Sequence, residues 1–241
     1  MNKLLSMFKR KSSGLKCSVV VVAAGTASRM QGIDKVLATL GDVPILVRTL
    51  QVFQSCQDVA EIVVVTREDL LVEIGDVCKA YMLDKVSKIL VGGAERVLSV
   101  RAGLRAVDPE TELIAIHDAA RPFLTQQVFK EVLEQAAASG AAAPAVPVND
   151  TIKRAENAIV QETVDRSTLW AIQTPQVFQA DLIRAAVEKA CSDGAQITDD
   201  CSAVERLGMK VVLTAGDRQN IKVTTPFDLM LGEAILAQRE E

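Results

Sequence analysis

The sequence predicts an α/β fold: a mostly parallel sheet with helices on both faces, plus one protruding β-hairpin arm. Continuous apolar runs, such as "SVVVV" (18–22), alternate along the chain with segments whose apolar residues recur at helical intervals. A composition of 49% hydrophobic and 24% charged residues over 241 positions is sufficient for a buried core. A polar segment at 149–170 interrupts the alternation, and it has the pattern of a hairpin.

The alternation divides the chain into elements. Buried strands are expected at 18–24, 61–66, 88–92, 112–117 and 210–215. Helices are expected at 44–56, 68–82, 95–107, 125–139 and 179–192, with another opening at Thr198 and a last one starting at 225–228. In the last helix Thr225 can cap the N-terminus, Pro226 suits the first turn and Asp228 favours the helix dipole.

Residues 149–170 contain no amphipathic helix. They are expected to form short polar strands, with turns at Glu156-Asn157 and Arg166-Ser167. An isolated hairpin is marginally stable in water. We therefore expect this arm to pack against a partner surface.

Bulk properties exclude several classes of protein. The net charge of -4 and the 3% aromatic content argue against a nucleic-acid partner. Five scattered cysteines without CxxC spacing predict free thiols in a reducing compartment, and hence a cytoplasmic location. No apolar run is long enough to span a membrane, so no membrane association is expected.

The N-terminus, "MNKLLSMFKRKSSGLK", is basic but lacks a signal-peptide core of adequate length and a small-residue cleavage site. We expect residues 1–16 to be a flexible extension, with a short amphipathic membrane contact as the alternative. Residues 17–241 are expected to form a single domain.

The loop "AAGTASRMQGIDK" (23–35) follows the first strand. It fits neither the G-x-G-x-x-G dinucleotide fingerprint nor the Walker pattern. Its backbone N–H groups, with Arg29 and Lys35 beside them, suit a triphosphate whose charge must be neutralised during reaction. The alternative is a solvated surface loop with incidental basic residues.

This loop, "GGAER" (92–96) and "HDAARP" (117–122) all lie beyond the carboxyl ends of predicted strands, where ligands of such sheets bind. In "HDAARP" (117–122) we interpret the single histidine, His117, as structural. Asp118 could hold Mg²⁺ or cap the following turn, and Arg121 could pair with it or bind a second anion. Lys222 in "NIKVTTPFD" precedes a helix start, as a phosphate-binding residue or an ordinary surface lysine.

Together these motifs resemble the 2-C-methyl-D-erythritol 4-phosphate cytidylyltransferase family of the non-mevalonate isoprenoid pathway. The matching stretches include "AAGTASRM", "VGGAERVLSV", "IHDAARPF", "TVDRSTLW", "QTPQVF", "ITDDCSAVE" and "NIKVTTPFD". They occur in family order from about 18 to 239. The loop departs from the common family pattern at Ala27, where a second glycine is usual, and in "IDKV", where Pro-Lys-Gln is usual.

The resemblance implies a Rossmann-like nucleotidyltransferase that joins CTP to methylerythritol 4-phosphate with Mg²⁺ and releases pyrophosphate. It implies catalytic roles for Arg29, Lys35, Arg166 and Lys222, and CTP binding by Ala23, Ala24, Gly25, Gly93, Ser99 and Ala119. The acceptor would contact Asp118, Arg121, Thr151, Arg166, Thr174, Thr198 and Lys222, with Asp118 also holding the metal. A homodimer is implied, in which the 149–170 arm acts across the interface.

Two alternatives remain open. The acceptor could be a pentitol phosphate, because such relatives share the CTP loop. The chain could also be a catalytically idle nucleotide-binding protein, since a fold alone does not give function. An idle protein is expected to have lost Lys35 or Asp118, and both residues are present.

Overall fold

The computed structural model describes residues 16–25 and 36–240. Within them an eight-stranded sheet has the order β10-β7-β11-β6-β1-β4-β5, and its eighth strand, β12, also pairs with β7. Four strands form the main parallel part of the sheet: β1 (Cys17–Val22), β4 (Val59–Thr66), β5 (Val86–Val91) and β6 (Leu113–Asp118). Strand β1 pairs with β4 and β6, and β4 pairs with β5, in each case in parallel. Strand β7 also pairs in parallel with β12 (Val212–Ala215). The predicted α/β class is confirmed.

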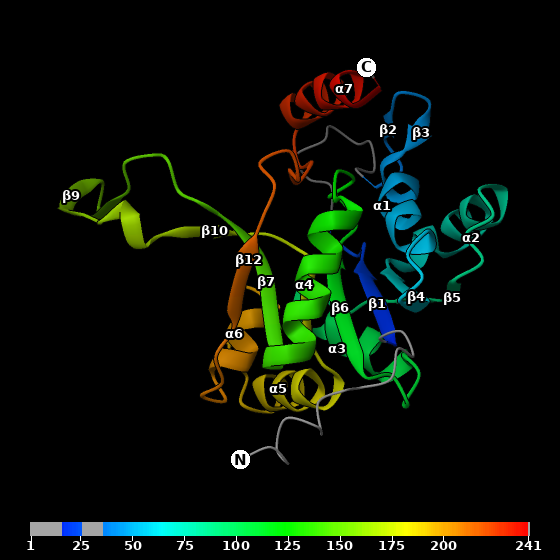
Figure 1. Ribbon diagram of the computed structural model, residues 1–241, viewed down its shortest axis with the longest axis horizontal. Helices are drawn as coiled ribbons and strands as arrows, with labels where there is room; N and C mark the ends of the chain where they lie inside the picture. Colours follow the sequence, from blue (N-terminus) through cyan, green and yellow to red (C-terminus); the bar gives the residue numbers. More distant parts are fainter. Residues whose placement is uncertain (1–15, 26–35, 241) are drawn as a thin grey trace, which may run out of the picture.

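Helices cover both faces of the sheet (Figure 1). On one face, α1 (Ile45–Gln54), α2 (Leu71–Ala80) and α4 (Gln126–Ser139) pack with Val19 and Val21 of β1. On the other face, α3 (Arg96–Ala106), α5 (Ala180–Ser192) and α6 (Asp200–Glu205) pack with Val20. Because successive residues of β1 are buried on opposite faces, the strand is a continuous apolar run.

Three strands of the main sheet were not predicted: β7 (Ala141–Pro147), β10 (Trp170–Ile172) and β11 (Gln176–Gln179). Alanine and proline dominate β7, which reads "AAAPAVP" and has a single β-branched residue, Val146, where a strand usually has several. β11 runs antiparallel to β6 and β7, and β10 runs antiparallel to β7. The sheet is therefore mixed on this side, where the chain leaves for the arm and returns.

The arm has the predicted hairpin. β8 (Lys153–Glu156) and β9 (Ile159–Thr163) form their own two-stranded sheet, and η2 (Arg166–Thr168) occupies the second predicted turn. Asn157 and Ala158 join the strands with φ of 49° and 62°, the geometry of a tight hairpin turn. Every residue from 149 to 163 is exposed, and the arm extends away from the sheet in Figure 1.

The last helix, α7 (Pro226–Glu240), begins as predicted. The Thr225 hydroxyl accepts a hydrogen bond from the Asp228 amide, and Asp228 accepts from the Thr225 amide at 2.8 Å. α7 packs beside the small β2 (Thr39–Leu40) and β3 (Val43–Pro44) pair near the top of Figure 1. A short 3-10 turn, η1 (Glu68–Leu70), precedes α2.

All five cysteines are free thiols, as expected. In the described part of the chain, no helix combines the length and the apolar character that crossing a membrane requires.

Candidate functional site

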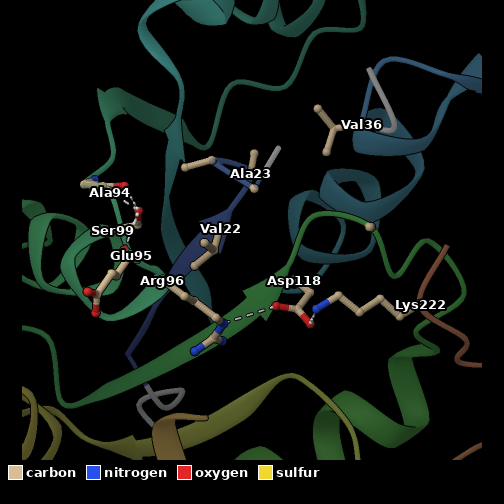
Figure 2. Close-up of a pocket in the computed structure, with 13 residues that line it drawn as sticks. Val22, Ala23, Val36, Ala94, Glu95, Arg96, Ser99, Asp118 and Lys222 are labelled. Atoms are coloured by element: carbon tan, nitrogen blue, oxygen red, sulfur yellow. Dashed lines mark hydrogen bonds and ion pairs between the residues drawn. The ribbon is translucent and has the colours of Figure 1, made fainter. Parts of the chain in front are cut away.

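A cavity of about 240 Å³ lies beyond the carboxyl ends of β1, β5 and β6. Figure 2 shows its lining, which comes from stretches that lie far apart in the sequence. These residues are Val22, Ala23, Ala24, Gly25, Val36, Gly93, Ala94, Glu95, Arg96, Ser99, Asp118, Ala120 and Lys222. The position is the one at which parallel α/β sheets bind ligands.

One wall of the cavity is mostly backbone. A side chain at Gly92 would place its Cβ 2.7 Å from Cβ of Ala24, so only glycine lets the end of β5 pack this closely against the end of β1. The buried Ser99 hydroxyl accepts a hydrogen bond from the Gly93 amide at 3.1 Å and fixes the turn into α3. Backbone amides and carbonyls on rigid turns can read the polar edge of a base.

The opposite wall is a charged cluster centred on Asp118. Lys222 Nζ lies 2.8 Å from Asp118 Oδ2, and Arg121 Nε lies 3.7 Å from the same oxygen. Arg96 Nε lies 3.6 Å from Oδ1. Figure 2 shows Lys222 and Arg96 approaching the carboxylate from opposite sides. One carboxylate thus meets three cations contributed by α3, the loop after β6 and the segment before α7.

These cations keep Asp118 ionised. Burial by itself raises the pKa of the carboxyl, but the charges of Lys222, Arg96 and Arg121 lower the pKa to about 2. Two of these cations, Lys222 and Arg96, line the cavity, where such groups can bind the oxygens of a polyphosphate ligand.

Arg96 and Asp200 were not among the predicted site residues. Asp200 has no exposed surface, and its two carboxylate oxygens accept from both terminal nitrogens of Arg96 at 2.9 Å and 2.7 Å. Burial opposes the charge on Arg96, but Asp200 and Asp118 raise the pKa of the guanidinium above its usual value. The two residues stand far apart in sequence, and a carboxylate at a helix start is commonly a cap, so no pattern marks the pair.

His117 is structural, as interpreted from the sequence. It is fully buried, its Nε2 lies 3.2 Å from the Arg121 carbonyl oxygen, and its Nδ1 lies 3.1 Å from the Thr174 hydroxyl. Burial lowers the pKa of His117 to about 4, so the ring is neutral at pH 7. The Thr174 hydroxyl also accepts a hydrogen bond from the Asp118 amide at 3.1 Å, and this bond helps to hold the backbone of Asp118 in position.

The structure brings some of the predicted site residues together at the cavity, but not all of them. Seven of them line the cavity: Ala23, Ala24, Gly25, Gly93, Ser99, Asp118 and Lys222. Ala119 does not line it, because its backbone pairs with Val22 and Thr49; the next residue, Ala120, lines the cavity instead.

Thr151 and Arg166 lie on the arm, where Arg166 donates to the Asn149 carbonyl. Thr198 is exposed, one residue before the Asp199 cap of α6. Arg29 and Lys35 lie outside the described residues.

Comparison with known proteins identifies the family. A profile of the 2-C-methyl-D-erythritol 4-phosphate cytidylyltransferase family matches residues 17–238. The chain belongs to this family. The protein of that name from Halalkalibacterium halodurans is 44% identical over 227 residues, covering 94% of this chain and 99% of the relative. The one from Geobacillus kaustophilus is 44% identical over 221 residues, covering 91% and 96%.

Solved structures of the cytidylyltransferase family share the fold. The 4-diphosphocytidyl-2C-methyl-D-erythritol synthase from Anaerococcus prevotii has a TM-score of 0.82 and 31% identity, covering 93% of this chain and 97% of that one. The cytidylyltransferase from Thermus thermophilus has a TM-score of 0.76 and 33% identity, covering 90% and 98%. The chain is thus a nucleotidyltransferase by family, and the cavity around Asp118 is its candidate active site.

The donor set of this site fits a magnesium ion that is held partly by substrate. Among the described residues no group of three or more His, Cys, Asp or Glu side chains is arranged to hold a metal. Mg²⁺ commonly binds through one or two carboxylates together with substrate phosphates. The ionised Asp118, which lines the cavity beside Lys222, matches that mode.

Proposed function

We propose that this chain transfers the cytidylyl group of CTP to 2-C-methyl-D-erythritol 4-phosphate, giving 4-diphosphocytidyl-2-C-methyl-D-erythritol and pyrophosphate. The observation that carries the proposal is the cavity around Asp118, which combines a backbone wall with a wall of cations, in a member of this family. A base with a triphosphate presents the complementary surface, since polar edges match amides and phosphates match cations.

The reaction is an in-line displacement at the α-phosphorus of CTP. An oxygen of the acceptor's phosphate forms the new bond to this phosphorus, and the bond from the α-phosphorus to the oxygen bridging to the β-phosphate breaks. Pyrophosphate leaves with the electron pair. The protein forms no covalent intermediate, so it acts through positioning and charge stabilisation.

The two walls have different roles in this proposal. Ala23, Ala24, Gly25, Gly93 and Ser99 hold the cytidine. Lys222, 2.8 Å from Asp118, directs its charge towards the reacting phosphates. Arg29 and Lys35 follow Gly25 in the chain, and we propose that they stabilise the charge that develops on the triphosphate.

Asp118 would hold Mg²⁺, which when bound neutralises phosphate charge and orients the triphosphate. Because Lys222 already contacts Oδ2, Asp118 would offer Oδ1 or exchange the lysine for the metal. Arg121, anchored by its 2.7 Å hydrogen bond to the Asn220 carbonyl, remains beside the carboxylate in either case.

We propose that residues 17–241 act as one domain and that the 149–170 arm forms a homodimer. In one chain the arm extends away from the sheet (Figure 1), whereas the cavity lies beyond the ends of β1 and β6. Thr151 and Arg166 would therefore enter the site of the partner, where the acceptor's phosphate binds. Thr198, Arg121 and Lys222 would complete that subsite, and Thr174 would support it through Asp118.

The decisive experiment is a turnover assay of the purified protein with CTP, Mg²⁺ and each acceptor, read as pyrophosphate release. Methylerythritol 4-phosphate is expected to give turnover, and a pentitol phosphate is expected to give at least tenfold less kcat/KM, because unmatched polar groups are rejected. A preference for the pentitol phosphate would contradict the assigned acceptor, and no turnover with either would contradict the assigned reaction. The free thiols agree with the cytoplasmic location proposed for this reaction.

A further inference from the structure

Asp200 contacts the active site only through another residue. It has no exposed surface and does not line the cavity, yet both of its oxygens bind the guanidinium of Arg96, which does line it. The third nitrogen, Arg96 Nε, faces Asp118 Oδ1 at 3.6 Å. With two donors engaged by Asp200, the plane of the guanidinium is fixed and only its Nε edge is directed at Asp118.

Asp200 is itself held in place from the sheet. It is the first residue of α6, and its amide and that of Cys201 both donate to Gln176 Oε1 at 2.9 Å. Gln176 is buried at the start of β11 and pairs with Ile116 of β6, two residues before Asp118. The side chain of Gln176 also donates to Asp199 Oδ2 at 2.7 Å. The strand that carries Asp118 therefore also fixes the residue that orients Arg96.

Stability alone does not explain a buried ion pair of this kind. Desolvation of the two charges offsets much of their attraction, and well-packed apolar side chains can often replace such a pair without loss of stability. Here one member of the pair, Arg96, also faces the carboxylate of Asp118, which lines the cavity.

We infer that Asp200 is a positioning residue of the cytidylyl-transfer reaction, which orients Arg96 so that the carboxylate of Asp118 keeps one fixed orientation. This inference rests on the proposed function. Removing a group that orients a functional carboxylate typically costs 10- to 100-fold in activity or metal affinity.

The test compares variants in the CTP and methylerythritol 4-phosphate assay, with each melting temperature measured alongside. Asp200→Asn keeps the size of the side chain and removes its charge and one acceptor. Its kcat is expected to fall about 10- to 100-fold. Glu205→Gln is the matched control, because it also removes one carboxylate charge from α6, but at an exposed position outside the cavity. Its kcat is expected to stay within about twofold of the wild type.

A second pair of variants separates positioning from stability. Arg96→Met combined with Asp200→Val replaces the ion pair with apolar groups, and we expect it to fold with a melting temperature near that of the wild type but to lose activity as Asp200→Asn does. Arg96→Lys keeps the positive charge but loses the bidentate hydrogen bonds to Asp200, so its kcat is also expected to fall by about tenfold or more.

Wild-type kcat in Asp200→Asn and in the apolar double variant would overturn the inference, because the pair would then be structural only. The two proposals fail separately in this assay. A failure of the proposed function appears in the wild type, whereas a failure of this inference appears as active variants beside an active wild type.

Discussion

The Asp118 cluster and the 149–170 arm are opposite in character. Asp118 is 8% exposed, and three cations lie within 3.7 Å of its oxygens. On the arm, Ile159 is 67% exposed and Val160 is 57% exposed, and no residue of the hairpin from 149 to 163 is buried. The cluster is complete within one chain, whereas the arm presents apolar and charged groups that the same chain does not cover.

The difference indicates that the Asp118 cluster and the arm have separate roles in the proposed reaction. Groups that must keep one geometry, such as Asp118, are held by the sheet and by buried ion pairs. Exposed apolar residues gathered on one projecting segment mark an interaction surface, and an isolated hairpin gains stability by packing against a partner. We therefore propose that each chain supplies the nucleotide half of its own site and part of the acceptor half of its partner's site.

Lys222→Ala breaks the cluster and is expected to have the largest effect. Removing a cation that stabilises transition-state charge costs roughly 100-fold or more in kcat. The measurement is turnover at saturating substrates. Lys210→Ala is the control, since Lys210 is exposed outside the cavity. Near-normal turnover in Lys222→Ala would show that Lys222 is an ordinary surface lysine.

Arg166→Ala tests the arm and is expected to separate activity from stability. Arg166 is exposed, and among the described residues its side chain donates to the Asn149 carbonyl alone, so the free energy of unfolding should change by less than about 0.5 kcal/mol. Turnover should fall by about tenfold or more if the residue positions the acceptor. Arg154→Ala, an exposed arginine of the hairpin that pairs with Glu162, is the matched control. Equal turnover in both variants would remove Arg166 from the site.

Comparing wild type with Asp118→Asn at different pH values measures how strongly the three cations stabilise the ionised carboxylate of Asp118. The pKa of Asp118 is about 2 in the folded chain, below its ordinary value of 3.8, so its contribution to stability is present above pH 4 and is lost as the pH falls towards 2. The size is roughly 2 kcal/mol at pH 7 and about 1 kcal/mol at pH 3. In urea unfolding, the difference between wild type and variant should shrink by about 1 kcal/mol between these pH values. A difference independent of pH would show that the three cations do not stabilise the carboxylate.

Ala158→Gly is expected to have the smallest effect. Ala158 has φ of 62°, which costs a residue with a side chain about 1 kcal/mol, and Asn-Gly is the preferred tight turn. The arm should gain hydrogen-exchange protection while the melting temperature of the body stays within about 1 °C, because the arm opens independently of the core. A rise of several degrees would show that arm and body unfold together.

The sequence predicted the parts of the molecule whose patterns are local. β1 and the first four residues of β6 are continuous apolar runs, α4 has helical spacing, and the hairpin turn includes Asn157. The sequence missed β7, because its alanines and prolines form a strand only through pairing with β11 and β12.

Prediction of the site was limited in the same way. Asp118 and Lys222 could be placed at one edge because strand ends and helix starts meet there. The Arg96–Asp200 pair could not, since it depends on α3 and α6 covering the same face of the sheet. Thr174 was predicted as a ligand of the acceptor, and the structure shows its hydroxyl occupied by His117 and the Asp118 amide.

The most direct test of the shared site is subunit complementation between Lys35→Ala and Arg166→Ala, each inactive or nearly so alone. If the arm acts in the partner's site, a mixed dimer contains one site with both substitutions and one intact site. Mixing the variants, with subunit exchange verified by mass spectrometry, should then restore activity well above either variant alone. If every site is formed within one chain, each site of the mixed dimer carries a substitution. Mixed dimers that form but recover no activity would contradict the shared site.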